Sequence, residues 1–334
     1  MALRTGKLPP ELLKKLLKHG GSKDRRVLQG PGIGEDAAVV RLGKSLLVLK
    51  TDPVTYASDM IGWYAVNVNA NDVATRGATP AWFQAAVLLP EGSNEKQAES
   101  VFKQISEACK ELGIAVTGGH TEVTPGIDHV IVVGDMHGIV IGRKAVSSSG
   151  ARTGDLLVMT KSAGIEGTAL IARERRAELA RVFKGGFVTR AADYLKHPGL
   201  SIVPEALDAL KYNVTAMHDP TEGGVSMGAW ELAEASGHSV ELWADQIKIA
   251  RETEMLCAKY ELDPLGLLGS GSLLATFSPK NAARYVAHLE MKDMDVAVVG
   301  KIMSGRGRSR LVSKGVSTEL SSSERDEVLK VLSP

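Results

Sequence analysis

Short β-rich runs alternate with helical runs through the second half of the chain, and this alternation limits the possible folds more than any other feature of the sequence. The expected strands are 156–160, 214–217, 239–243, 272–277 and 296–302. The expected helices are 166–180, 203–210, 225–235, 250–260 and 281–289. Such alternation is typical of a layered α/β domain, so we expect a sheet with helices on one face.

The first half of the chain is β-heavy and contains two long helical runs. A helical pattern over 61–76 is stopped by Gly77, and a second one over 94–112 is ended by Gly113. A chain of 334 residues favours two domains, and the small, polar residues 146–155 form the best boundary between them. We therefore expect one domain over 1–150 and another over 151–334. The strands expected in the first of these are 37–41, 46–51, 82–89, 114–117 and 129–140.

Composition argues against several classes of function. The formal charge is +1 and the basic residues are scattered, so we expect neither a nucleic acid nor an anionic membrane as partner. The longest apolar stretch is interrupted by Asp135 and His137, and the N-terminus lacks the apolar core of a signal peptide, which together predict a cytoplasmic protein. The two cysteines, Cys109 and Cys257, lie in helical segments without C-x-x-C spacing and are interpreted as buried structural thiols.

Two segments of the first half place carboxylates beside glycine or threonine. In GPGIGEDAAVV, residues 30–40, the glycines let backbone N–H groups approach an anion, while Glu35 and Asp36 can hold a cation that accompanies a phosphate. In the run 49–52 an apolar strand ends in Thr51 and Asp52. Taken alone, each acidic residue is more often part of a turn or a helix cap than of a metal site.

The helical run 61–76 is mostly apolar and is expected to be buried. Its exceptions Asn67, Asn71 and Thr75 are four residues apart and share one face, with Asp72 beside them. Polar side chains on a buried helix need partners, because each unsatisfied group costs about 1–3 kcal/mol. The sequence leaves open whether those partners are protein groups or a ligand and its metal.

Two further segments carry paired glycines. In TGGHTE, residues 117–122, Gly118 and Gly119 permit a close backbone approach, and His120 is more often a structural residue than a ligand. In HDPTEGG, residues 218–224, the glycines begin a helix whose free N–H groups favour anions. Asp219 can hold a metal there, or it caps the helix.

Together these segments form a more specific pattern than any one of them. Four carboxylates recur at turns or helices beside glycine or threonine, and no G-x-x-x-x-G-K-S/T loop is present in the sequence. The pattern predicts a nucleotide site built from aspartates and magnesium. The four residues are Asp36, Asp52, Asp72 and Asp219.

The order and approximate spacing of these motifs resemble the ATP-using superfamily of aminoimidazole ribonucleotide synthetase, selenophosphate synthetase, thiamine-monophosphate kinase and the hydrogenase maturation factor HypE, and HDPTEGG is most similar to HypE. The resemblance implies a PurM-like two-domain α/β fold, with an N-terminal β-rich domain for ATP binding and dimerisation and a C-terminal ferredoxin-like α/β domain. It implies that Asp36, Asp52, Asp72 and Asp219 bind Mg²⁺ and phosphate, with Asp72 and Asp219 catalytic. The nucleotide-binding residues that it implies are Lys23, Thr51, Asn71, Thr117, Gly118 and Gly119.

Two departures from HypE affect the expected reaction. HypE ends in a cysteine that carries the carbamoyl group, whereas this sequence has no cysteine after Cys257, and Ser270 stands where HypE has a glutamate. We therefore expect an ATP- and Mg²⁺-dependent homodimer that phosphorylates an oxygen of a small molecule. The alternatives are a nucleotide-binding regulatory paralogue without turnover, and a hydrogenase maturation factor that acts with a partner protein and another thiol.

Overall fold

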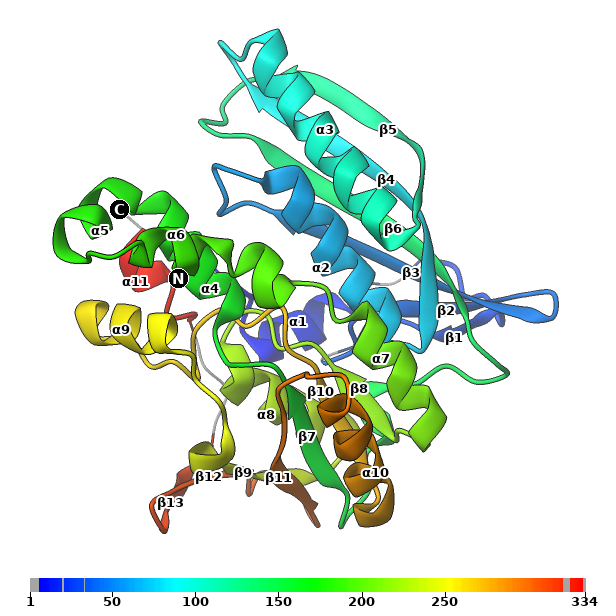
Figure 1. Cartoon of the computed structure of the whole chain (residues 1–334). Coiled ribbons are helices and arrows are strands. Elements are labelled where there is room, and N and C mark those ends of the chain that lie inside the picture. Colours follow the sequence, from blue (N-terminus) through cyan, green and yellow to red (C-terminus); the bar gives the residue numbers. More distant parts are fainter. Residues whose placement is uncertain (1–5, 20, 33, 321–324, 333–334) are drawn as a thin grey trace. The chain divides into compact units, whose positions relative to one another are not determined.

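The computed structural model describes residues 6–19, 21–32, 34–320 and 325–332 (Figure 1). The chain divides into two compact units. The smaller unit comprises Arg25–Gly30 and Asp36–Ala145, and the larger unit comprises Val146–Pro334 with the segments Met1–Asp24 and Pro31–Glu35. The N-terminal segment, with the short helix α1 (Pro10–Leu16), therefore belongs to the larger unit, which a single division near residue 150 did not anticipate.

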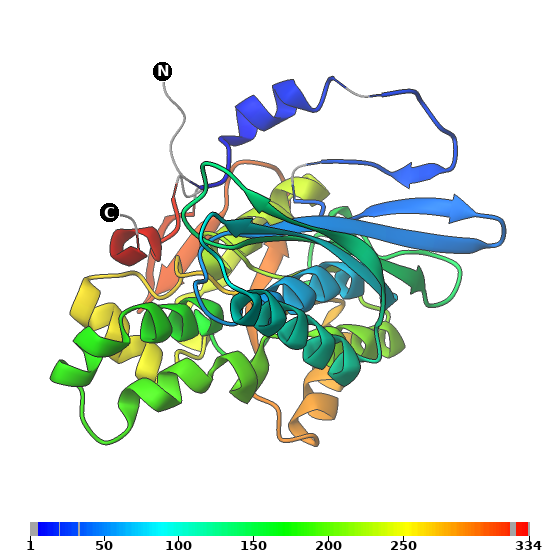
Figure 2. The same cartoon turned by 90° about the horizontal axis from the view of Figure 1, so that it is seen from above.

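A six-stranded sheet forms the smaller unit. Its strand order is β1-β2-β3-β6-β4-β5, and its neighbouring strands are antiparallel except for the parallel pair β4 and β5. Helices α2 (Ile61–Thr75) and α3 (Glu95–Leu112) lie on the same side of this sheet (Figure 2). The strands are β1 (Val27–Gln29), β2 (Ala38–Leu42), β3 (Ser45–Val54), β4 (Ala78–Pro90), β5 (Ala115–Thr124) and β6 (Ile131–Val140).

The two helices of the smaller unit begin and end close to where the sequence predicts. Asn94 caps α3 by accepting a hydrogen bond from the backbone N–H of Gln97, and Gly113 ends the helix with a φ of 68°. Every residue of α2 is buried. The helix packs so closely on β6 that a Cβ at Gly138 would lie 2.4 Å from Val73 Cγ1, so this strand needs glycine there.

A seven-stranded sheet of order β13-β12-β9-β11-β7-β10-β8 forms the larger unit, with β9 and β12 parallel and the other pairs antiparallel. The strands are β7 (Leu156–Thr160), β8 (Ala216–His218), β9 (Ser239–Trp243), β10 (Leu274–Phe277), β11 (Val296–Met303), β12 (Arg310–Ser313) and β13 (Val316–Glu319). The helices are α4 (Ile165–Glu174), α5 (Arg176–Val182), α6 (Phe187–Asp193), α7 (Val203–Ala209), α8 (Gly224–Ser236), α9 (Arg251–Tyr260), α10 (Pro279–Glu290) and α11 (Leu329–Leu332).

Helices cover this sheet on both faces, which corrects the expectation of one. Leu274 belongs to the hydrophobic cluster formed with Val225 and Leu232 of α8. The ring of Phe277, three residues along β10, packs in a tilted arrangement against Tyr285 of α10, with the ring centroids 4.8 Å apart. Because successive strand residues point to opposite faces, α8 and α10 lie on opposite sides. The expected helix 166–180 is also divided, into α4 and α5, at Arg175.

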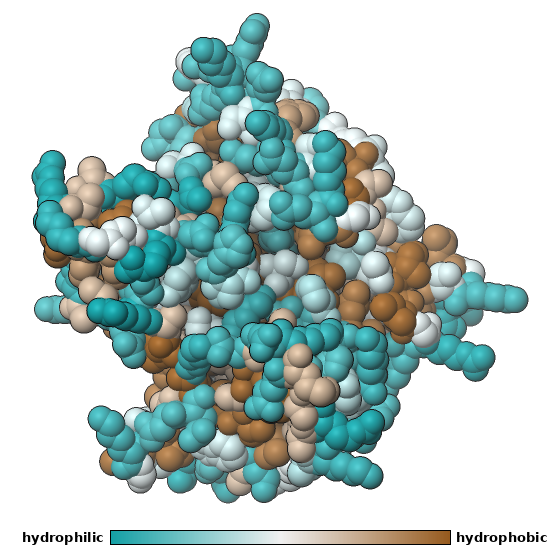
Figure 3. All heavy atoms as spheres, viewed as in Figure 1, coloured by the Kyte–Doolittle hydropathy of each residue, from teal (hydrophilic) through white to brown (hydrophobic). Residues whose placement is uncertain are grey.

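Hydrophobic side chains also reach the surface of the smaller unit. Figure 3 shows them gathered over the region of β2 and β3. Leu28 of β1 and Leu42 of β2 are exposed. None of the helices formed by the described residues is long and apolar enough to cross a membrane.

Candidate nucleotide and metal site

Three of the four predicted aspartates lie in the smaller unit: Asp52 in β3, Asp72 in α2, and Asp36 in the loop before β2. Alternation along β3 points Lys50 and Asp52 toward α2, and Lys50 Nζ lies 2.9 Å from Asp72 Oδ2 and 3.5 Å from Asp52 Oδ2. At the end of α2, the guanidinium of Arg76 lies 3.3 Å from Asp36 Oδ2. We call Asp36, Asp52 and Asp72, with Lys50 and Arg76, the carboxylate cluster.

The two basic residues of the carboxylate cluster are held in different ways. Arg76 is fully buried, while the Lys50 side chain retains 18% of its exposure. Burial by itself would lower the pKa of Lys50, but the carboxylates of Asp72, Asp52 and Asp36 outweigh it and raise this pKa well above its usual value. Lys50 is therefore a cation at neutral pH.

The polar face of α2 is engaged by protein groups. Asn67 Nδ2 donates to the carbonyl of Trp63. The single hydroxyl hydrogen of Thr75 has two acceptors within reach, the Asp72 carbonyl at 2.8 Å and Asp36 Oδ2 at 3.0 Å. Asn71 is fully buried. The question left open by the sequence is thus answered for Asn67 and Thr75, and Thr75 orients a carboxylate of the cluster.

The opposite face of the sheet carries Thr51. Its hydroxyl donates to Asp135 Oδ1 at 3.1 Å, and Gln84 Nε2 donates to Asp135 Oδ2 at 2.7 Å. Thr51 and Asp52 are neighbours in sequence but point to different sides of β3, so the structure separates this predicted nucleotide contact from the carboxylate cluster.

The predicted nucleotide residues Thr117, Gly118 and Gly119 all lie in β5. The close approach that Gly119 permits is to β4, because a Cβ at this position would lie 2.2 Å from the Ala85 carbonyl oxygen. In the sheet order, β6 and β4 separate β5 from β3, a spacing of about 14 Å at about 4.8 Å per strand. Within one chain these residues therefore do not join the carboxylate cluster.

Asp219 lies in the larger unit, directly after β8, and is 1% exposed. The preceding His218 bonds through Nε2 to Glu231 Oε2 at 3.0 Å. Lys23 also belongs to the larger unit and is exposed.

The start of α8 was expected to offer free N–H groups to an anion, and one of these is already used. The N–H of Gly223 donates to Asp326 Oδ2 at 2.6 Å, and Leu268 and Val328 also donate backbone N–H groups to this carboxylate. Burial raises the pKa of Asp326 to about 6, although these three donors lower it. An internal carboxylate thus occupies this position.

Ser270 lies in the loop between α9 and β10, next to Gly269, which packs against Pro220. The N–H of Gly269 donates to the carbonyl of Thr221, which ties the loop to the segment after β8. Ser270 is fully buried, and its hydroxyl has no hydrogen-bond partner within the part of the chain that the structure describes.

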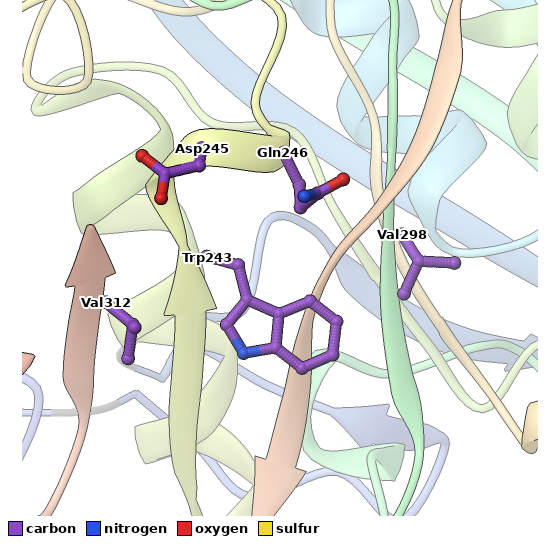
Figure 4. Close-up of a pocket in the computed structure, with 5 residues that line it drawn as sticks. All are labelled: Trp243, Asp245, Gln246, Val298 and Val312. Atoms are coloured by element: carbon purple, nitrogen blue, oxygen red, sulfur yellow. The ribbon is translucent and has the colours of Figure 1, made fainter. Parts of the chain in front are cut away.

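A cavity of about 510 Å³ lies in the larger unit, and none of its lining residues is a predicted site residue. It is lined by Trp243, Asp245, Gln246, Val298 and Val312, and the indole ring lies between the two valines (Figure 4). Asp245 already accepts hydrogen bonds from Ser313 Oγ and from the N–H of Lys314. The cavity therefore offers an aromatic wall without a group poised for catalysis.

Sequence reasoning missed Lys50, Asn69 and Arg76. Asn69 Nδ2 donates to the carbonyls of Ala65 and Asp52 and so joins α2 to β3. The two-residue period of a strand already places Lys50 on the face of Asp52, and that signal was available in the sequence. A fully buried Arg76 could not be inferred, since arginine is rarely buried unless it is paired.

The carboxylate cluster suits a magnesium ion in its donor chemistry. Mg²⁺ binds carboxylate oxygens, and Asp36, Asp52 and Asp72 supply them from the loop before β2, from β3 and from α2. Two cationic side chains, Lys50 and Arg76, already form ion pairs with these oxygens.

Comparison with known proteins identifies relatives over most of the chain. Residues 34–140 match the N-terminal domain of AIR synthase related proteins, and residues 152–312 match the C-terminal domain. A Methanocaldococcus jannaschii protein provisionally named for hydrogenase expression and formation is 27% identical over 264 residues, covering 76% of this chain and 75% of its own. The thiamine-monophosphate kinase of Aquifex aeolicus is 26% identical over 301 residues, covering 85% and 90%.

The fold also matches a solved structure of the hydrogenase maturation protein HypE in complex with ATP. The TM-score is 0.73 at 21% identity, over 94% of this chain and 91% of the other. At this level of identity the match establishes the two-domain α/β architecture expected from the sequence.

Proposed function

Because the chain belongs to the AIR synthase-related family, we propose that it is an ATP-dependent enzyme that transfers the γ-phosphoryl group to an oxygen of a small molecule. The carboxylate cluster is the observation that carries this proposal, since it gathers the acidic side chains of Asp52 in β3, Asp72 in the buried helix α2 and Asp36 in the loop before β2. A relative named thiamine-monophosphate kinase, and a HypE of the same fold in complex with ATP, support the choice of nucleotide.

In this proposal Asp36, Asp52 and Asp72 hold Mg²⁺. A bound divalent cation supplies the positive charge that neutralises charge developing on a transferring phosphoryl group. The surrounding residues keep the ligands in place: Arg76 and Thr75 orient Asp36, and the α2 backbone carries Asp72. Such positioning is the main contribution of a protein to phosphoryl transfer.

We also propose, independently of the carboxylate cluster, that Asp219 is a catalytic residue. It is buried at a strand end in the larger unit, in the segment HDPTEGG that resembles HypE. Asp219→Asn is expected to lower ATP turnover at least tenfold, and the exposed Asp193→Asn in the same unit serves as its control. Unchanged turnover in Asp219→Asn would remove it from the catalytic residues.

A hydrogenase maturation role with a different thiol acceptor is less well supported. Burial raises the pKa of Cys109 to about 11 and the pKa of Cys257 to about 12, the latter with help from Asp263 and Glu327. The thiolate is the reactive form, so neither side chain is a ready nucleophile at neutral pH.

The alternative of a regulatory protein without turnover is tested by measuring ADP release from ATP by the purified protein in the presence of Mg²⁺.

A second copy of this chain is the partner that we propose. The strand β5 lies at the edge of its sheet, and its side chains are exposed from Ala115 to Val123. Val116 and Val123 are both more than half exposed, and an exposed edge strand is a ready template for pairing with another chain. We expect a homodimer through the smaller unit.

The dimer is tested by sedimentation at micromolar concentration. Val116→Lys is expected to give a monomer, because it places a charge on the proposed contact. The control, Val316→Lys, changes an equally exposed valine of β13 in the larger unit and should remain dimeric. A monomeric wild-type chain would reject the proposal.

A further inference from the structure

Lys50 occupies the position among the aspartates where a metal ion would be expected. Its ammonium nitrogen lies 2.9 Å from Asp72 Oδ2 and 3.5 Å from Asp52 Oδ2. Asp72 is nearly buried, with 4% of its side chain exposed, so its charge needs a counter-ion. In this structure Lys50 provides that counter-ion.

An ammonium group and a divalent cation compete for the same ligands. The lysine ammonium only donates hydrogen bonds, and carboxylate oxygens are its natural acceptors. The same oxygens are the preferred ligands of Mg²⁺ and Ca²⁺. Placing Mg²⁺ between Asp52 and Asp72 while the ammonium stays in contact with both would bring two positive centres together, so one must move.

Of the two basic residues in the cluster, Lys50 is the one able to move. Arg76 is fully buried and its planar guanidinium is fixed against Asp36. The Lys50 side chain has 18% of its surface exposed and ends in a compact charge on a flexible four-carbon stem. Arg76 is thus a permanent partner of Asp36, and Lys50 an exchangeable partner of Asp72.

We propose that Lys50 is a positioning residue that acts as an internal counter-ion: it holds Asp52 and Asp72 in place in the metal-free protein and gives way when a divalent cation binds. This inference rests on the proposed function, because it assumes that the carboxylate cluster binds a metal. It adds that the protein sets its own metal affinity through the competition of Lys50. Removing the lysine charge therefore strengthens metal binding, whereas a merely structural lysine would leave it unchanged or weakened.

The test uses Mn²⁺ alone, without nucleotide, titrated into the full chain and followed by calorimetry and by the electron paramagnetic resonance signal of free Mn²⁺. Lys50→Met is expected to bind Mn²⁺ at least tenfold more tightly than wild type. Lys50→Arg, which keeps the charge, should bind no more tightly than wild type. The control Lys44→Met removes an exposed lysine from the turn before β3 and should match wild type.

Melting temperatures supply a second readout. In EDTA, Lys50→Met should melt below wild type because Asp72 loses its counter-ion, and saturating Mn²⁺ should remove most of that difference. If Lys50→Met does not fold in EDTA, Lys50→Gln keeps a hydrogen-bond donor and takes its place in the titration.

Equal or weaker Mn²⁺ binding by the neutral variants would overturn the proposal, as would a wild type and variants that all fail to bind Mn²⁺. Failure of the proposed function has a different signature. In that case wild type binds no ATP, although Mn²⁺ binding and its increase in Lys50→Met are still observed.

Discussion

Replacing Asp72 by asparagine separates a metal ligand from a structural ion-pair partner. Asn keeps the shape of the side chain and removes its charge. Removing one partner of a buried ion pair costs about 3–5 kcal/mol when the other charge is left alone. Here Lys50 keeps Asp52 at 3.5 Å, so we expect a smaller loss of about 2 kcal/mol, or about 5 °C in melting temperature.

The effect on ligand binding is the decisive part of this prediction. If Asp72 is a ligand, calorimetric affinity for ATP with Mg²⁺ should fall at least tenfold, about 1.4 kcal/mol. Asp128→Asn is the matched control, since Asp128 is an almost fully exposed aspartate of the same unit. A variant that melts early but binds Mg-ATP like wild type would make Asp72 purely structural.

Two further predictions concern stability. Asp208 is buried, which would raise its pKa, but hydrogen bonds from Lys211, Lys292 and His288 outweigh this and hold the pKa well below its ordinary value. A lowered folded-state pKa contributes stability that is present above pH of about 4 and is lost as pH falls below it. Asp208→Asn should therefore destabilise the protein by about 2 kcal/mol at pH 7 and by much less at pH 2, measured by urea unfolding. An equal loss at both pH values would refute the linkage. Gly119→Ala should cost at least about 2 kcal/mol of stability in the same assay, because its Cβ would meet the Ala85 carbonyl. The control Gly21→Ala should be near neutral, because a Cβ there meets nothing within 4 Å. Equal stability of the two variants would contradict the packing seen in β5.

The elements that the sequence predicted best are those with local signals. Residues 94–112 carry an N-cap and a glycine stop, and α3 follows them almost to the residue. The strand expected to end at Thr117 instead continues to Thr124, because pairing with β4 extends it through the two glycines. Pairing between distant strands is not encoded in a local window, which explains this error.

The candidate site was predicted in part for a similar reason. Attention to acidic residues found Asp36, Asp52 and Asp72, which β3 and α2 bring together. It did not find Lys50 or Arg76, because the ion pairs of Lys50 with Asp72 and of Arg76 with Asp36 join residues more than 20 positions apart; only the short-range pair of Lys50 with Asp52 was visible in the strand pattern. The resemblance suggested that residues of β5 also line the nucleotide, and within one chain the sheet order keeps them apart from the carboxylate cluster.

The most direct test of nucleotide binding through the carboxylate cluster is calorimetric titration of the wild-type chain with ATP, in Mg²⁺ and in EDTA. Metal-bridged binding predicts measurable affinity in Mg²⁺ and an affinity at least tenfold lower in EDTA. Equal affinity in the two buffers would remove the metal from the site, and no binding in either would contradict the proposed function.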